Sequence, residues 1–228
     1  MGFFDAYEAA IFDLDGTLAD SMHLWGQICR DWLLGYGKEP EDNLAAALSS
    51  MSLTQAAEYV ITTYGVRLPP ADVIGQWESM VLEAYRTRVA LKPGASELVR
   101  ALAGRGMKLA IATSCFPAAC EAVLARHRLR RFFSALVYTD EIKSPEGRTL
   151  NKTFPQIWLA AAARLGTAAE KCLVFEDMSA ALKGVRAAGM GFAAVWDASC
   201  PDWPAFSAQA DLALPSPQAA LPHLSPSP

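Results

Sequence analysis

The sequence predicts an α/β fold in which a doubly wound parallel sheet carries an all-helical insert after its first strand. From Leu91 onward, short apolar segments bounded by turn residues alternate with amphipathic helical segments. This alternation is typical of a parallel sheet built from right-handed crossovers. Between the first apolar segment and residue 88, in contrast, the apolar positions recur only at helical spacing. An all-helical insert directly after the first strand suggests a lid over a site.

The predicted strands share short runs of apolar residues followed by turn or polar residues. They lie at 9–12, 108–112, 135–138, 172–175 and 192–196. The predicted helices share apolar residues spaced by three or four positions and begin near Ser, Pro or Gly. They lie at 22–35, 43–48, 54–64, 71–88, 95–104, 117–127, 155–165 and 179–188.

These elements define the expected domain organisation. We expect an α/β core of residues 1–19 and 90–214 and a helical cap of residues 20–89. After residue 214 the chain is rich in Pro and Ser, which predicts a disordered tail over 215–228.

Two acidic residues follow the first predicted strand, where the chain turns at a glycine. Asp13 and Asp15 come directly after 9–12, and Gly16 allows a sharp turn. Open α/β sheets bind ligands beyond the carboxyl ends of their strands. Two carboxylates at one strand end repel each other unless a cation or a shared proton relieves them. The pair therefore indicates a metal-dependent reaction, with a solvated acidic turn as the structural alternative.

Polar groups that suit an anion and a cation also follow the later strands. They are the hydroxyl groups of Thr113 and Ser114, the amine of Lys152 at a helix start, and the acidic pair Glu176 and Asp177. Helix starts favour anions, and Mg²⁺ binds carboxylate oxygens together with substrate phosphate. Because these groups share one edge of one sheet, they predict a Mg²⁺-assisted phosphoryl-transfer site.

Four segments resemble, in order and with plausible spacing, the four motifs of the haloacid dehalogenase superfamily. They are Asp-Leu-Asp-Gly-Thr-Leu at 13–18, Ile-Ala-Thr-Ser at 111–114, Asn-Lys-Thr-Phe-Pro at 151–155 and Cys-Leu-Val-Phe-Glu-Asp at 172–177. The resemblance covers residues 9 to about 200. The helical insert is similar to the class-one cap of the β-phosphoglucomutase-like branch. The resemblance implies a Rossmann-like core and a phosphoric monoester hydrolase.

The resemblance also implies the catalytic roles. Asp13 would attack phosphorus and form an aspartyl-phosphate, while Asp15 would protonate the leaving oxygen and then activate water. The Mg²⁺ ligands implied in this way are Asp13, the carbonyl of Asp15, Asp177 and the neighbouring Glu176. Asp15 further favours phosphate esters, because the dehalogenases and the phosphonate-cleaving relatives lack an acid at this position.

Three residues are the implied ligands of the phosphoryl oxygens. Thr113 and Lys152 would neutralise charge in the transition state, and Ser114 is a weaker candidate for this task. Lys143 is the alternative to Lys152 for the lysine role, because residues 143–150 look like an extra loop relative to the usual length of this segment in the family. The helix-start context favours Lys152.

The charge of one loop in the predicted cap, residues 48–54, distinguishes a phosphatase from a mutase. The residues expected to contact substrate there are Ser49, Ser50, Ser52, Thr54 and, nearer the hinge, His23. A mutase of this branch must bind a second phosphate, and the loop has no charge. We therefore expect a phosphatase for a small phosphorylated metabolite. The alternatives are a β-phosphoglucomutase-type sugar phosphomutase and a catalytically silent binding protein.

Composition narrows the remaining possibilities. The net charge of −4 gives no electrostatic reason to expect nucleic-acid binding, and no apolar run is long enough to span a membrane. The N-terminus lacks the features of a signal peptide. The five cysteines are scattered, which indicates a reducing compartment, and we expect Cys115 to be a buried apolar residue. These features predict a cytoplasmic protein that does not bind membranes or nucleic acid, and we expect a monomer.

Overall fold

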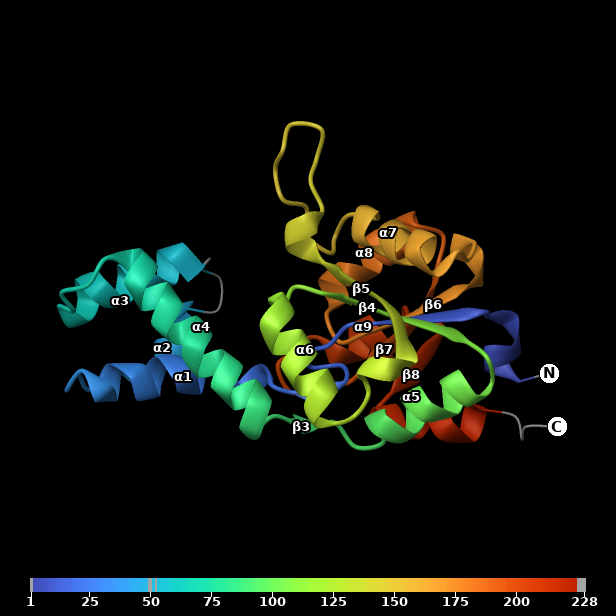
Figure 1. Cartoon of the computed structure of the whole chain (residues 1–228), viewed down its shortest axis with the longest axis horizontal. Coiled ribbons are helices and arrows are strands. Elements are labelled where there is room, and N and C mark those ends of the chain that lie inside the picture. The colour runs from blue at the N-terminus through green and yellow to red at the C-terminus, as the bar shows by residue number, and fades with distance from the viewer. Residues whose placement is uncertain (1, 49–50, 52, 225–228) are drawn as a thin grey trace. The chain divides into compact units, whose positions relative to one another are not determined.

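The computed structural model describes residues 2–48, 51 and 53–224, and the chain forms two compact units (Figure 1). The first, called here the core unit, consists of Met1–Asp20 and Ala90–Pro228. The second, called the helical unit, consists of Ser21–Val89. The chain therefore leaves the core unit once and returns to it once.

Within the described residues, the core unit is built on a six-stranded sheet with the order β5-β4-β1-β6-β7-β8. The strands are β1 (Ala9–Phe12), β4 (Lys108–Thr113), β5 (Phe133–Tyr138), β6 (Cys172–Glu176), β7 (Gly191–Val195) and β8 (Leu212–Leu214). All neighbouring pairs are parallel. Phe12 is in register with Ile111 on one side and Phe175 on the other, so the carboxyl ends of the three central strands meet at one edge. The predicted α/β class with a parallel sheet is confirmed.

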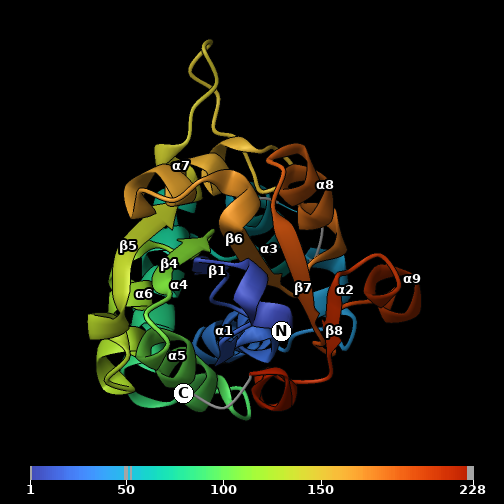
Figure 2. The ribbon, with the colours of Figure 1, turned by 90° about the vertical axis from the view of Figure 1, so that its right-hand side faces the viewer.

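Helices cover both faces of this sheet. They are α5 (Ala95–Gly104), α6 (Pro117–Arg126), α7 (Gln156–Leu165), α8 (Ser179–Ala187) and α9 (Trp203–Ser207). Figure 2 shows α7 and α8 on one face and α5 and α6 on the other. Trp158 of α7 is fully buried and belongs to an apolar cluster that includes residues of β1, β4 and β6 and extends to Phe206 of α9. Burial of such aromatic side chains dominates the energetics of a core.

A short antiparallel ribbon marks the exit from the core unit and the return to it. It pairs β2 (Ala19–Asp20) with β3 (Ala90–Leu91). Neither strand is among those that the sequence predicts, because a two-residue strand has no detectable alternation of polar and apolar residues.

The helical unit contains α1 (Met22–Gly35), α2 (Leu44–Leu48), α3 (Leu53–Tyr64) and α4 (Pro70–Thr87). Trp32 of α1 packs edge-on against Trp77 of α4, with ring centroids 5.7 Å apart. The Trp32 indole N–H donates to Gln76 Oε1 at 2.7 Å, so the tryptophan ties two helices together. Across the described residues of both units, no helix is long and apolar enough to span a bilayer.

The prediction of a disordered tail from residue 215 is wrong for its first part. Residues Pro217–His223 form a 3₁₀ helix, η5, that packs on α5 and buries Ala220. Gln218 N donates to Pro93 O at 3.0 Å. At Gly94, which has a φ of +78°, an added Cβ would overlap Gln218. The composition suggested disorder, but the few apolar residues among the prolines are enough to dock this turn.

Candidate active site

The nucleophile candidate Asp13 extends the central strand of the sheet. Its backbone N–H donates to Phe175 O at 2.9 Å, and its side chain is buried beyond the end of β1. The chain then turns back on itself: Gly16, with a φ of +80°, donates its N–H to Ala19 O at 2.9 Å. Asp15 lies half-buried inside this turn. The positive φ explains the glycine, because a side chain is strained there.

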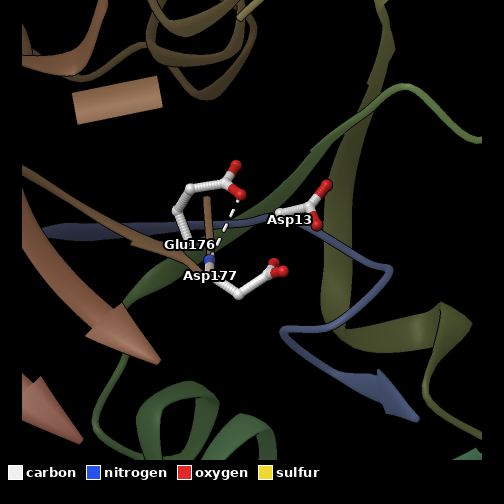
Figure 3. A group of neighbouring side chains, drawn as sticks. All are labelled: Asp13, Glu176 and Asp177. Atoms are coloured by element: carbon white, nitrogen blue, oxygen red, sulfur yellow. Dashed lines mark hydrogen bonds between the residues drawn. The ribbon is translucent and has the colours of Figure 1, made fainter. Parts of the chain in front are cut away.

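Three buried carboxylates converge at the edge of the sheet (Figure 3). Asp13 follows β1, Glu176 ends β6 and Asp177 comes next, and one oxygen of each lies within 4.8 Å of the others. Thr17 Oγ1 donates to Asp177 Oδ1 at 2.8 Å and holds that carboxylate in place. A Cβ built on Gly16 would overlap Asp177, so the glycine also allows the turn to pack directly on this carboxylate.

A lysine lies among these acids. Lys152 is buried, and its Nζ donates to Asp13 Oδ1 and, at 2.8 Å, to Glu176 Oε2. Burial opposes its charged form, but the two carboxylates outweigh burial and raise the pKa of Lys152. Lys143, the competing candidate, instead donates to Thr149 Oγ1 at 2.5 Å in the loop that projects from the core unit in Figure 1. The structure thus brings Lys152, and not Lys143, to the carboxylates.

Contacts with Trp158 and Gly184 fix the backbone of the turn that carries Lys152. The Trp158 indole N–H donates to Lys152 O at 3.1 Å. Gly184 of α8 packs so closely that an added Cβ would overlap Lys152 O and lie 2.9 Å from Trp158 Nε1. Tryptophan and glycine therefore set the position of the lysine backbone, and the sequence analysis identified neither role.

Glu176 accepts three hydrogen bonds that metal binding alone would not require. Its Oε2 accepts from Lys152, while its Oε1 accepts from the backbone N–H groups of Asp177 at 3.2 Å and Met178 at 3.1 Å. The sequence analysis grouped Glu176 with the metal ligands. The structure shows that it also orients Lys152 and fixes the backbone after β6.

Burial and the excess of acidic groups over Lys152 raise the pKa values of Asp13 and Asp177. Burial raises the pKa of Asp13 well above its usual value; Lys152 opposes this, while Glu176, Asp177 and Asp15 add to it. Burial, followed by the charge of Glu176, raises the pKa of Asp177 to about 7. A divalent cation would reverse both effects, since it favours the ionised carboxylates.

This cluster fits a hard divalent cation. Its donors are all carboxylate oxygens, which suit Mg²⁺ better than a softer transition metal. The three carboxylates carry more negative charge than Lys152 can balance, so a further positive charge between Asp13 and Asp177 would stabilise the cluster. The residues present therefore fit the Mg²⁺ ion that the sequence predicts.

The hydroxyl candidates differ in their surroundings. Thr113 ends β4 and is buried, and its Oγ1 accepts from Cys115 N at 2.9 Å. That bond uses the oxygen as an acceptor and is compatible with donation of the hydroxyl hydrogen to a phosphoryl oxygen. Ser114 is exposed. Cys115 is buried, and burial and the nearby Asp15 charge raise the pKa of its thiol, so it stays protonated.

The cap candidates belong to the helical unit. Thr54 lies in the first turn of α3 and His23 in the first turn of α1, and both are exposed. Ser49, Ser50 and Ser52 lie outside the described residues.

Another buried lysine lies close to the turn of Asp15 and Gly16, and the sequence alone did not reveal it. Lys92, which follows β3, donates to Gly16 O at 2.7 Å and pairs with Asp197 Oδ2 at 2.8 Å. In the sequence it precedes Pro93-Gly94 at a helix start, which is an ordinary place for a solvated lysine. No local pattern distinguishes it, because its partners lie 76 and 105 residues away.

A parallel α/β sheet whose central strands end in buried carboxylates, with a buried lysine beside them, is typical of a phosphoryl-transfer class of hydrolase. The family model described as haloacid dehalogenase-like hydrolase matches residues 10–195. The chain therefore belongs to the haloacid dehalogenase-like hydrolase family, and the predicted resemblance is confirmed.

Similar proteins include two curated phosphatases. Fructose-1-phosphate phosphatase YqaB of Escherichia coli is 29% identical over 187 residues, 82% of this chain and 95% of that protein. (DL)-glycerol-3-phosphatase 1 of Arabidopsis thaliana is 31% identical over 192 residues, 82% of this chain and 63% of that protein. Among solved structures, a Thermotoga maritima protein proposed to be a β-phosphoglucomutase has a TM-score of 0.82 at 24% identity, covering 94% of this chain and 97% of that one. This last likeness shows the shared fold.

Proposed function

We propose that this protein is a divalent-cation-dependent phosphatase that hydrolyses a small phosphorylated metabolite through an aspartyl-phosphate on Asp13. The observation that carries the proposal is the buried pair Asp13 and Asp177, which follow the adjacent strands β1 and β6, together with buried Lys152, which donates to Asp13. The names of similar proteins, which include phosphatases of a sugar phosphate and of glycerol 3-phosphate, support the class of substrate.

In the first step, an Asp13 oxygen attacks phosphorus and the bond to the leaving oxygen breaks. Asp15 gives a proton to that oxygen, so the product leaves as an alcohol. In the second step, Asp15 takes a proton from water, which attacks phosphorus, releases inorganic phosphate and restores Asp13. A carboxylate nucleophile divides one difficult displacement into two easier ones.

Charge on the phosphoryl oxygens is met by residues already fixed in place. Lys152 is anchored by Glu176 and by the Trp158 bond to its carbonyl, so it needs no reorganisation when charge develops. Thr113 offers a hydroxyl from the end of β4. Asp13, Asp177 and the Asp15 carbonyl, with Glu176 beside them, would hold a Mg²⁺ ion, which would supply Lewis-acid stabilisation of the phosphoryl group.

The test measures release of inorganic phosphate from a panel of sugar phosphates, polyol phosphates, nucleotides and p-nitrophenyl phosphate, with and without Mg²⁺. We expect Mg²⁺-dependent turnover that Asp13→Asn lowers by at least about 1,000-fold, because it removes the nucleophile. Asp202→Asn, an exposed aspartate at the start of α9, is the matched control and keeps full activity.

Two outcomes would overturn the proposal. Accumulation of a sugar bisphosphate without phosphate release would assign the protein as a phosphomutase. Mg²⁺ binding by calorimetry without turnover of any phosphate ester would assign it as a catalytically silent binding protein.

A further inference from the structure

Lys92 has a complete set of hydrogen-bond partners inside the core unit. Its three Nζ hydrogens meet three acceptors: Gly16 O at 2.7 Å, Trp196 O at 2.5 Å and Asp197 Oδ2 at 2.8 Å. The Lys92 and Asp197 side chains are each only 7% exposed. A buried ammonium with three fixed acceptors joins the segments it contacts rigidly, because moving any one of them leaves a buried polar group unpaired.

Asp197 is itself held in place. Its Oδ1 accepts from the Ser199 backbone N–H at 2.9 Å and from Ser199 Oγ at 2.7 Å. Burial alone would raise the pKa of Asp197, but the bonds from Lys92 and Ser199 outweigh burial and lower it. The lysine is therefore anchored to a charged, oriented carboxylate after β7.

The segment that Lys92 fixes is the turn of the proposed catalytic site. Gly16 follows Asp15 directly, and its Cα packs on Asp177 with no space for a side chain. The next residue, Thr17, donates to Asp177 Oδ1. A shift of the Gly16 carbonyl would therefore move the acid/base candidate and one carboxylate of the cluster together.

We propose that Lys92 is a positioning residue, which holds the turn of Asp15 and Gly16 against Asp177 from its anchor on Asp197. Lys92 contacts neither the carboxylate cluster nor Lys152 through any bond of its own among the described residues. Its effect on the reaction passes through the Gly16 carbonyl. The kinetic part of this inference rests on the proposed phosphatase function, and the part about the turn does not.

The first experiment measures the turn directly in the metal-free protein. The amides of Gly16, Leu18 and Ala19 are hydrogen-bonded within the turn at 2.8–2.9 Å. We expect Lys92→Met, which keeps the length of the side chain, to speed hydrogen exchange in peptides covering 13–19 about tenfold or more. Lys108→Met is the matched control: Lys108 is an exposed lysine whose Nζ also donates to a glycine carbonyl, Gly166 O, at 3.1 Å. It should leave exchange in this segment unchanged.

The second experiment measures kinetics with p-nitrophenyl phosphate and Mg²⁺. We expect Lys92→Met to lower kcat about 10- to 100-fold, since a small misplacement of catalytic groups has an effect of this size. KM should change less than threefold, because Lys92 makes no contact that would bind substrate. Lys108→Met again serves as the control.

A double variant separates positioning from a merely structural role. Lys92→Met leaves Asp197 buried without its cation, so a fall in thermal stability is expected for that reason alone. Lys92→Met with Asp197→Asn removes the unpaired charge while keeping an acceptor for Ser199. We expect this protein to regain most of its thermal stability but to keep fast exchange at 13–19 and a low kcat.

The inference is overturned if kcat returns to the wild-type value together with stability, or if exchange at 13–19 is unchanged in Lys92→Met. If wild-type protein shows no phosphatase turnover, the proposed function fails. The exchange experiment still decides whether Lys92 holds the turn.

Discussion

Gly184 in α8 offers a direct test of how the position of Lys152 is set. Its Cα faces the turn of Lys152, and an added Cβ would overlap Lys152 O. The same Cβ would lie 2.8 Å from Phe154 O and 2.9 Å from Trp158 Nε1, closer than real Cβ atoms come to such neighbours. Two of the three contacts are backbone carbonyls, which cannot move aside as a flexible side chain can.

The magnitude of the Gly184→Ala effect follows from opposing contributions. Replacing glycine in a helix interior normally stabilises a protein by about 1 kcal/mol. Overpacking costs about 1–3 kcal/mol, and loss of the Trp158 bond to Lys152 O costs about 1 kcal/mol more. We therefore expect net destabilisation of about 1–3 kcal/mol. Because the displaced turn carries Lys152, kcat should also fall about 10- to 100-fold.

Gly104→Ala is the matched control, because Gly104 lies in another core helix, α5, with nothing within 4 Å of an added Cβ. It should leave stability unchanged or raise it by up to about 1 kcal/mol. Urea unfolding followed by circular dichroism, together with phosphate release, measures both effects. If Gly184→Ala proved as stable and as active as Gly104→Ala, the account of how α8 and Trp158 hold the lysine would be refuted.

Three further predictions concern the cluster and the C-terminal turn. Lys152→Met should lower kcat about 100- to 1,000-fold, as expected for loss of a buried charge-stabilising group, and activity within tenfold of wild type would contradict this role. The pKa of Asp177 is raised from 3.8 to about 7. Between these pH values, the Asp177 carboxyl is therefore protonated in the folded metal-free protein but ionised in the unfolded chain. The contribution of Asp177 to the free energy of unfolding therefore falls as the pH rises from 3.8 toward 7. Because Mg²⁺ binds the ionised carboxylate, calorimetry should show tighter Mg²⁺ binding from pH 5.5 toward pH 7. Binding that does not change with pH would exclude the raised pKa. Truncation after Leu214 should lower Tm by about 4–8 °C, because it uncovers α5 and costs about 2 kcal/mol, whereas a disordered tail could be removed without effect.

The parts of the fold that sequence reasoning predicted are those with a strong local pattern. The central strands β1, β4, β6 and β7 are short apolar runs bounded by turn residues, and each lies where its pattern placed it. Their parallel pairing then brings Asp13, Glu176 and Asp177 together at one edge. In this region, local propensity and topology agree.

The missed parts depend on contacts made far along the chain. The edge strand β8 has three residues, and η5 has a composition typical of disorder, so neither has a periodic pattern. Glu176 is predicted as a metal ligand with Asp13, Asp15 and Asp177, but the acidic pair gives no sign that Glu176 also accepts a hydrogen bond from Lys152. Lys92 precedes an ordinary helix start, and only the folded chain shows that its amine reaches Gly16.

The strand order has a consequence for how the protein is made. β1 is the first strand of the chain, yet it lies at the centre of the sheet between β4 and β6, which begin at Lys108 and Cys172. Asp13 is therefore synthesised before Asp177, which follows it by more than 160 residues, and the carboxylate cluster can form only when both are present. Sheets built from such distant pairings fold slowly, because loops must close before contacts compensate for the lost chain entropy. A nascent chain that stalls between Asp13 and Asp177 therefore carries the nucleophile candidate Asp13 without Glu176 and Asp177 or without Asp177 alone.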